Sequence, residues 1–288
     1  MKLRKVFGVG ALLLAVLAVL ATAAYVWRGP LSVLVAQRVA PGRLAADTLK
    51  QLPDGLHVGL CGASSPFPDE RRSGPCTVVV AGLRMAYGQD QHYRVAHHGD
   101  ATVPATGSGG TAQPFQVGPA GRVTVLQDGD LRIDAFLVDH APIQPAVGYR
   151  IQYKGRTVVI SGDTKKSASV QREAQGVDLL LHEALSEPLM AVLETGAAQA
   201  GRPQLKKIFN DILNYHTTPE QAAEVARDAQ VRYLVLHHIV PALPLPGMDQ
   251  AFLGGAPGIY RGPIRVGLDG DFFSLLPGST EVNFSRRF

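Results

Sequence analysis

The chain has 288 residues, of which 46% are hydrophobic and 18% are charged, with 28 Lys plus Arg against 24 Asp plus Glu. This composition excludes an intrinsically disordered or collagen-like chain. Three of the 28 cations, Lys2, Arg4 and Lys5, lie within the first five residues, which leaves 25 basic and 24 acidic residues in the rest. So small an excess argues against a nucleic-acid partner, because proteins that bind nucleic acids neutralise phosphates with Lys and Arg.

Residues 7–27 contain no charged side chain and are numerous enough for one helix that spans a bilayer. The cations before this segment and the single Arg28 after it predict a cytoplasmic N-terminus and a periplasmic remainder. One interpretation is an uncleaved anchor in the inner membrane, which interfacial Tyr25 and Trp27 favour; the other is a signal peptide cleaved near Ala23, which gives a periplasmic or secreted product. A buried core helix is the third alternative, although core helices seldom have an apolar surface on all sides.

The two cysteines, Cys61 and Cys76, both fall in the part that we expect to be exported. Thiols in an oxidising compartment can pair, and the turn-rich segment between them would let two neighbouring strands bring the sulfurs together. We therefore expect a disulfide. Two buried free thiols remain an alternative, as does a metal-binding pair, which lacks the close spacing of most zinc sites.

After a linker over residues 28–53, residues 54–288 are long enough for one domain. Turn dipeptides at Asp128-Gly129 and Lys154-Gly155 predict two hairpins. Thr218, Pro219 and Gln221 form a capping box that starts a helix, which we expect to reach about Gln230. Strands are expected at 56–60, 77–81, 122–127, 131–139, 147–153, 156–161, 177–181 and 231–236, and loops at 102–121 and 242–262. This order of elements indicates an α/β domain with packed sheets.

Polar or titratable residues directly follow four of the apolar strands. They are His140, Asp163, the pair His182-Glu183 and the pair His237-His238. A rigid sheet can aim side chains at one point from its strand ends, so we expect these residues to converge. Two imidazoles and one carboxylate suit zinc or a similar divalent ion. A single histidine at a strand end can equally have a structural role, so we infer a metal site only from the four segments together.

Taken in order, these segments resemble the second half of the metallo-β-lactamase-fold hydrolases, in the branch of ribonuclease Z and related phosphodiesterase and arylsulfatase-like enzymes. The resemblance spans residues 56–240 and includes an opening strand and Gly-rich turn at 57–66. The segments that carry it are 147–151, 155–164 (Gly-Arg-Thr-Val-Val-Ile-Ser-Gly-Asp-Thr), 178–184 (Asp-Leu-Leu-Leu-His-Glu-Ala), 215–223 (Tyr-His-Thr-Thr-Pro-Glu-Gln-Ala-Ala) and 234–239 (Leu-Val-Leu-His-His-Ile). It implies a metallo-β-lactamase-like αββα sandwich and a site for two zinc ions.

The resemblance implies metal ligands at three positions. His140 would bind one ion, His238 the other, and Asp163 would bridge both. His237 would be the neighbour that binds no metal, because consecutive strand residues point to opposite faces.

The resemblance also assigns roles around the metals. His216 matches a histidine that assists proton transfer near the scissile phosphate in ribonuclease Z. The carboxylate that orients this histidine there falls at Ile160 here, which implies that the proton relay is absent. For His182 and Glu183 we expect a structural role or a role in supporting the metal ligands.

The family's His-x-His-x-Asp-His signature is not in this sequence; His97-His98-Gly99-Asp100 comes near, but its histidines are adjacent. The chain passes from the strand at 77–81 to a segment at 86–99 that lies beyond the signature in intact members, which implies an internal loss near 83–86 and an incomplete sandwich with uncovered sheet edges. Each ion would keep two protein ligands, where catalytic zinc has at least three. Zinc binding is therefore expected to be weak or absent.

We expect an exported, membrane-anchored, metal-dependent hydrolase that acts on a phosphodiester, sulfate ester or related ester. Its partners would be a small-molecule or ester substrate and, through the N-terminal helix, the membrane; the exported location argues against nucleic acid. The alternative is a catalytically inactive relative that serves as a scaffold or binding module, or a defective deletion product. A third reading is a mononuclear enzyme in which His140, Asp163 and His238 share one ion.

Overall fold

A computed structural model describes residues 22, 52–63, 76–81, 84–85, 114–245 and 247–286. The chain divides into two compact units, Met1–Leu52 and Pro53–Phe288, and the fold described below belongs to the second. Within the described ranges, no helix has the length and apolar character needed to cross a membrane. Apart from Thr22, the expected leader lies outside the described residues, as do residues 28–51 of the linker and the segment around His97. The membrane helix and the domain boundaries therefore stay predictions.

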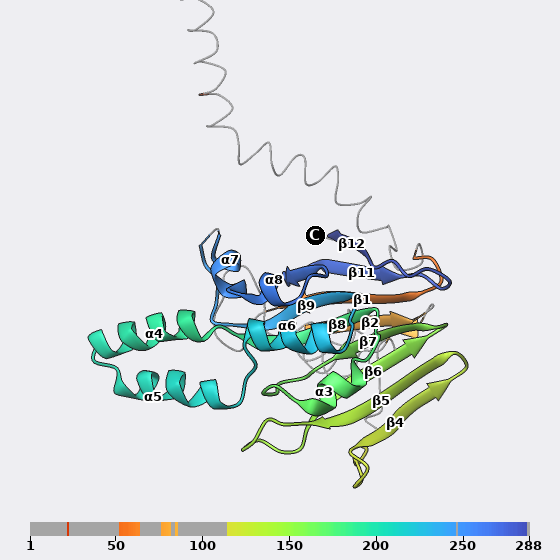
Figure 1. The fold of residues 1–288 in the computed structure, drawn as a ribbon, viewed down its shortest axis with the longest axis horizontal. Helices are drawn as coiled ribbons and strands as arrows, with labels where there is room; N and C mark the ends of the chain where they lie inside the picture. The colour runs from red at the N-terminus through yellow and green to blue at the C-terminus, as the bar shows by residue number, and fades with distance from the viewer. Residues whose placement is uncertain are drawn as a thin grey trace, which may run out of the picture. The chain divides into compact units, whose positions relative to one another are not determined.

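Two sheets form the centre of the second unit (Figure 1). The five-stranded sheet has the order β12-β11-β1-β2-β3 and is antiparallel throughout. Its strands are β1 Leu56–Gly62, β2 Cys76–Ala81, β3 Arg84–Met85, β11 Asp271–Leu275 and β12 Asn283–Arg286.

The seven-stranded sheet has the order β10-β9-β8-β7-β6-β5-β4. Strands β4 to β7 pair antiparallel, whereas β7, β8, β9 and β10 pair in parallel. Its strands are β4 Arg122–Asp128, β5 Leu131–Val138, β6 Ala146–Tyr153, β7 Arg156–Ile160, β8 Leu179–Leu185, β9 Tyr233–Val240 and β10 Ile264–Val266. The fold is therefore an α/β fold with mixed strand directions.

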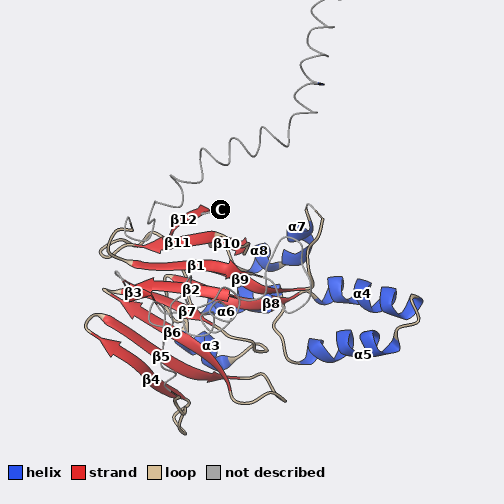
Figure 2. Ribbon diagram, turned by 180° about the vertical axis from the view of Figure 1, so that it is seen from behind, coloured by secondary structure: helices blue, strands red, loops and turns tan. Residues whose placement is uncertain are grey.

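Layers follow from the alternation of apolar side chains along the strands. On β8, Leu179 and Leu181 face the five-stranded sheet, whereas Leu180 faces the helices, as expected for strands buried on both faces. The helices that cover the far face of the seven-stranded sheet are α3 Ala168–Glu173, α6 Pro219–Asp228, α7 Met248–Leu253 and α8 Ala256–Ile259. Figure 2 shows the same layers from behind, with the five-stranded sheet in front. The described residues thus supply sheet, sheet and helices, three layers of the expected αββα sandwich.

Helices α4 Glu187–Gln199 and α5 Pro203–Asp211 lie side by side and extend beyond the edge of the sheets (Figures 1 and 2). A short 3-10 helix, Ile212–Asn214, follows them. A small separate core joins this helical pair to the ends of β8 and β9 through Met190, Leu185 and Val240. The chain returns from this projection directly into the segment that carries His216.

Local sequence signals account for the hairpins and for α6. At the first hairpin, Gly129 is the first of the two loop residues and has φ of 57°, as a type II′ turn requires. At the second, Lys154 and Gly155 have φ of 46° and 79°, as a type I′ turn requires. The α6 capping box is present, with the Thr218 hydroxyl accepting from the Gln221 backbone N–H and the Gln221 side chain accepting from the Thr218 N–H. These predictions are confirmed.

Strands β8 and β9 differ from their predicted positions. Each begins two residues later than expected and continues through the titratable residues that we expected directly after the apolar segment, so Glu183 and His238 lie within the strands. The two strands pair with each other through residues 182–185 and 236–240, past the ends of their pairing with β7 and β10, and the ladder therefore continues beyond the apolar segment. The segment 242–262, expected as a loop, contains α7 and α8.

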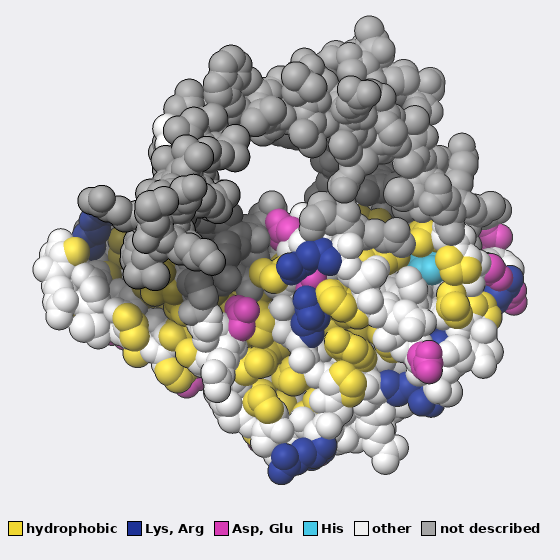
Figure 3. Space-filling view, turned by 90° about the horizontal axis from the view of Figure 1, so that it is seen from above, with side chains coloured by type: hydrophobic (Ala, Val, Ile, Leu, Met, Phe, Trp, Pro, Cys, Tyr) yellow, Lys and Arg dark blue, Asp and Glu magenta, His cyan; other side chains and the backbone are white. Residues whose placement is uncertain are grey.

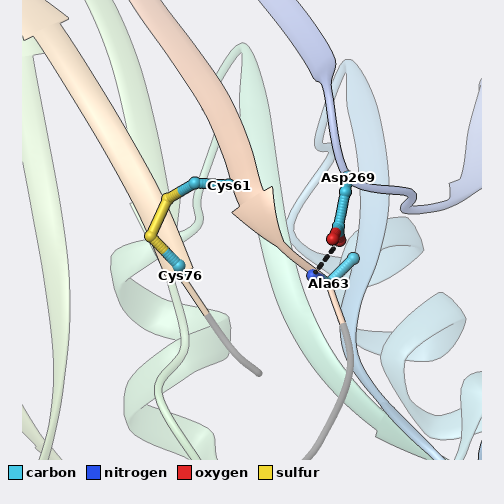
Figure 4. The surroundings of a disulfide bond; sticks show 4 residues. All are labelled: Cys61, Ala63, Cys76 and Asp269. Atoms are coloured by element: carbon cyan, nitrogen blue, oxygen red, sulfur yellow. Dashed lines mark hydrogen bonds between the residues drawn. A yellow bond between two sulfur atoms is a disulfide. The ribbon is translucent and has the colours of Figure 1, made fainter. Parts of the chain in front are cut away.

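The predicted disulfide is present between Cys61 in β1 and Cys76 in β2, with the two Cα atoms 5.0 Å apart (Figure 4). Beyond it, the Ala63 N–H donates a 2.8 Å hydrogen bond to Asp269, which follows β10 (Figure 4). Both contacts fix the end of β1 where the chain leaves the sheet.

A buried carboxylate, Asp134 on β5, joins the outer strands of the seven-stranded sheet. It accepts hydrogen bonds from Arg122 at 2.7 Å, from Thr124 at 2.6 Å and from Arg132 at 2.9 Å. Burial alone would raise the pKa of Asp134, but the hydrogen bonds from Arg132, Thr124 and Arg122 outweigh it and lower the pKa to about 2. The carboxylate is therefore ionised over the whole physiological range.

Candidate active site

Strand direction explains why distant residues meet at one edge of the seven-stranded sheet. Strands β7, β8 and β9 are parallel, and β5 runs in the same direction because β6 lies antiparallel between β5 and β7. The carboxyl ends of all four strands therefore lie at the same edge. His140 follows β5, Asp163 follows β7, and Glu183 and His238 lie near the ends of β8 and β9.

The histidines and Asp163 form a compact cluster at this edge. The Nε2 atom of His238 lies 3.5 Å from an Asp163 carboxylate oxygen. The His216 ring lies between the other two imidazoles, with its centroid 5.5 Å from that of His238 and 5.3 Å from that of His140. His238 and His216 are nearly buried, whereas the Asp163 side chain is 42% exposed and forms the solvent side of the cluster.

His140 is held on its far side by the segment that carries His216. Its Nδ1 atom hydrogen-bonds the backbone carbonyl of Tyr215 at 2.9 Å, and the Tyr215 ring meets it edge to face. The neighbouring Thr164 hydroxyl contacts both the backbone N–H and the carbonyl of Asp139 at 3.1 Å. The loop with Asp163 is thus tied to the segment with His140.

Gly162 positions Asp163 at the end of β7. Its φ is +63°, a conformation that L side chains rarely adopt, and a Cβ atom there would collide with the backbone carbonyl of Val147. Only glycine allows the chain to turn this closely past β6 before Asp163.

Glu183 provides the carboxylate partner of His216. Its Oε2 atom accepts from His216 Nδ1 at 3.2 Å, while its Oε1 atom accepts from the backbone N–H groups of Thr217 at 2.8 Å and Thr164 at 3.4 Å. The expectation that no carboxylate orients His216, drawn from Ile160, is therefore wrong. The partner comes from β8 instead of β7, and the Leu-His-Glu-Ala motif after an apolar segment was the signal that could have indicated it.

Burial and mutual charge shift both members of this pair. Burial raises the pKa of Glu183 above its ordinary value, against the opposing effect of His216. Burial lowers the pKa of His216, but its hydrogen bond to Glu183 and the charges of Glu183 and Asp163 outweigh this and leave the pKa raised. Burial thus favours the uncharged form of Glu183, whereas its contact with His216 favours the charged form of both groups.

A bulge in β9 sets the direction of His238. Glu183 pairs with His237 and Ala184 with Ile239, so His238 is an extra residue in the strand, and its φ is +49°. Its Nδ1 atom is buried and has no hydrogen-bond partner among the described residues. A strained backbone and an orphaned ring nitrogen at one residue are typical of a functional position.

His182 and His237 lie outside this cluster of ligand atoms. The His182 Nδ1 donates to the Glu183 carbonyl at 2.8 Å. The His182 Nε2 and both His237 nitrogens are buried and have no hydrogen-bond partner within the described part of the chain. Burial lowers the pKa of His182 to about 4, and burial together with the charges of His238 and His182 lowers that of His237 to about 3. Both rings are therefore neutral, and their predicted roles stay predictions.

Three side chains bring ligand atoms close enough to hold one ion. Glu183, His216 and His238 each offer one atom, all within 4.8 Å of one another, and no other such group occurs among the residues that the structure describes. Two imidazoles and a carboxylate are a donor set that fits zinc or another divalent metal. His140 and Asp163 border this group.

A two-sheet α/β fold with histidines and carboxylates gathered at the carboxyl edge of its strands defines the class of the metallo-β-lactamase-fold proteins. Residues 86–239, more than half of the chain, match the β-lactamase superfamily domain, and the chain belongs to this superfamily. The resemblance seen in the sequence is thereby confirmed.

The most informative relatives are ribonucleases. Ribonuclease Z of Mycobacterium tuberculosis (strain ATCC 25618 / H37Rv) is 33% identical over 205 residues, which cover 71% of this chain and 67% of that protein. Ribonuclease Z of Mycobacterium avium (strain 104) is 31% identical over 210 residues, or 71% of this chain and 65% of that protein. The chain thus spans about two thirds of the length of these relatives. Among solved structures, a metallo-β-lactamase fold protein from Bacillus subtilis aligns with a TM-score of 0.53 at 16% identity, over 77% of this chain and 100% of that one, and shares the fold.

These relatives correct our expectation about partners. We expected a small-molecule or ester substrate and no nucleic acid; this is wrong, because the relatives just described are named as ribonucleases. The expected contact with the membrane through the N-terminal helix stays a prediction. The small net charge was a poor guide to a nucleic-acid partner. It sums charges over the whole chain, whereas a nuclease needs basic residues only where it contacts phosphates. On the face in Figure 3, Lys and Arg side chains lie in several separate groups among hydrophobic ones.

Proposed function

We propose that the protein is a metal-dependent phosphodiesterase that hydrolyses RNA. The observation that carries this proposal is the buried pair of Glu183 and His216 beside His238 and Asp163, in a chain one third identical to ribonuclease Z. The site has a solvent-open side at Asp163, where a phosphodiester can approach, and a buried side that holds the proton-carrying pair.

Each residue has a task that its contacts support. His216 transfers a proton at the scissile phosphate, and Glu183 fixes the ring and favours its protonated form. Asp163 and His238, with His140 beside them, offer donors for a metal ion. Such an ion, when bound, supplies charge stabilisation at the phosphoryl oxygens and a more acidic water. The Thr217 N–H holds Glu183 in place through the other carboxylate oxygen.

The test uses an RNA oligonucleotide in which every 2′-hydroxyl is methylated. Metal-dependent hydrolysis employs water as the nucleophile, so this RNA stays a substrate, whereas contaminating nucleases that attack through the 2′-hydroxyl cannot cleave it. With Zn²⁺ or Mn²⁺ we expect cleavage by the wild-type chain and a loss of roughly 10²-fold or more in His216→Ala, the size of a lost acid–base group. Lys166→Met, which alters a solvent-exposed ion pair, is the control and should cleave normally. Equal rates for the wild type and His216→Ala would refute the proposal.

A catalytically inactive relative is the second candidate, because the His-x-His-x-Asp-His signature is absent from the sequence. In that case the chain binds the same RNA without cleaving it under any divalent metal. Retained binding measured by fluorescence anisotropy, together with no cleavage product, would support this candidate over the enzyme.

A further inference from the structure

The buried part of the cluster has the character of a separate ion site. Glu183 is fully buried, and it accepts hydrogen bonds from two backbone N–H groups and from the His216 ring. A buried carboxylate is costly unless a cation compensates it. A divalent ion would compensate the negative charge of Glu183 more completely than the His216 imidazole, which carries at most one positive charge.

The spacing of the donors suits one ion. Two ligand atoms at about 2.1 Å from a tetrahedral zinc ion lie about 3.4 Å apart. Glu183 Oε2 and His216 Nδ1 are 3.2 Å apart, and a His238 nitrogen completes a set of three within 4.8 Å. His140 does not join this set, and its Nδ1 is engaged by the Tyr215 carbonyl.

The donors are also held in position before any ion arrives. The Glu183 Oε1 atom accepts from the Thr217 N–H, which leaves Oε2 directed at His216. The bulge fixes His238, whose buried Nδ1 atom has no hydrogen-bond partner in the described ranges. Preorganised donors of this kind lose little conformational entropy when they bind an ion.

We propose that Glu183, His216 and His238 form a divalent-metal site of their own, distinct from the set of His140, Asp163 and His238 that the family resemblance implies, and that an ion bound there inhibits the enzyme. Inhibition follows because His216 cannot transfer a proton at the phosphate while it holds the ion. This last part rests on the proposed function, whereas the site itself does not.

The experiment separates the two ligand sets by Co²⁺ binding to the purified full chain, read from visible absorption and from calorimetric titration. Glu183→Gln keeps the shape of the side chain and should weaken Co²⁺ binding about tenfold or more. His140→Ala should leave the Co²⁺ binding step that depends on Glu183 within about twofold of the wild type, because His140 is not part of that set. Glu224→Gln, the same change in a half-exposed carboxylate of α6, is the matched control and should also bind within about twofold. Far-UV circular dichroism of each metal-free variant checks that it folds.

The outcomes are distinct. Loss of Co²⁺ binding in His140→Ala with retention in Glu183→Gln would overturn the proposal in favour of the family set, and so would a wild-type chain that binds no Co²⁺. If the site exists, hydrolysis of methylated RNA should first rise and then fall as Zn²⁺ increases. A chain that binds Co²⁺ through Glu183 but never cleaves RNA would refute the proposed function and leave the site intact. Hydrolysis that only rises with Zn²⁺ would overturn the inhibitory role.

Discussion

Arg156 should be one of the most costly residues to replace, because it joins the two sheets from a buried position. It lies at the start of β7, and its side chain is 3% exposed. The guanidinium binds Asp178 at 3.0 and 3.1 Å and donates to the backbone carbonyls of Leu276 at 2.9 Å, Ser279, and Glu281 at 2.9 Å. Those three carbonyls belong to the connection between β11 and β12 in the other sheet.

The expected loss in Arg156→Met can be worked from these contacts. Three carbonyls lose a charged donor, at about 1 kcal/mol each after partial replacement by water. Asp178 keeps the Thr157 N–H at 2.9 Å and a half-exposed Arg232 at 3.4 Å, so its charge is only partly uncompensated. The sum is about 3–5 kcal/mol, which is the range observed when one partner of a buried ion pair is removed. This is a large fraction of the stability of a typical domain.

The assay is urea unfolding followed by far-UV circular dichroism, with hydrogen exchange at β12 as the local measure. Lys166→Met, which breaks a half-exposed ion pair with Glu224, should cost less than about 1 kcal/mol. The double variant Arg156→Met/Asp178→Asn should lose less than the two single variants together, because the groups are coupled. A loss below about 1 kcal/mol in Arg156→Met, equal to that of Lys166→Met, would show that the two sheets are not held together in this way.

Three further predictions concern single side chains. Asp134→Asn should lose about 1–2 kcal/mol at pH 7; because the folded pKa is lowered to about 2, this difference from the wild type should shrink as pH falls from about 4 towards 2, and equal losses at pH 7 and pH 2.5 in urea unfolding would contradict it. Gly162→Ala should unfold at lower temperature and cleave less RNA than Gly155→Ala, since both have positive φ but only the first collides with Val147, and identical melting curves would remove the steric argument. Tyr260→Phe should cost about 1–2 kcal/mol in the same urea assay, because a buried backbone carbonyl loses its phenol donor.

The sequence predicted those elements whose causes are local. The turns at Asp128-Gly129 and Lys154-Gly155 and the capping box at Thr218 each depend on residues within three positions of one another. Their conformational preferences are therefore readable without the rest of the fold. The short strand β10 escaped prediction because three residues, Ile264–Val266, carry too little periodicity.

The candidate site was predictable in its members but not in its contacts. His216 and Glu183 are 33 positions apart, and only the pairing of β8 with β9 and the return of the chain from α5 bring them together. The bulge at His238 could not be predicted either, because no particular residue type marks an extra residue in a strand. The residue types alone indicated a metal-binding or acid–base site, whereas the hydrogen-bond partners of these residues could be found only from the tertiary fold.

The bulge has a consequence for how the site can be lost. Leu236 and Ile239 both face the helices although they are three positions apart, because His238 adds one residue to the period of the strand. Deletion of the single codon for His238 would restore ordinary alternation and leave every apolar side chain on its present face. The hydrophobic pattern of β9 does not depend on this histidine. A single in-frame deletion could therefore remove a residue of the candidate site while the fold is retained.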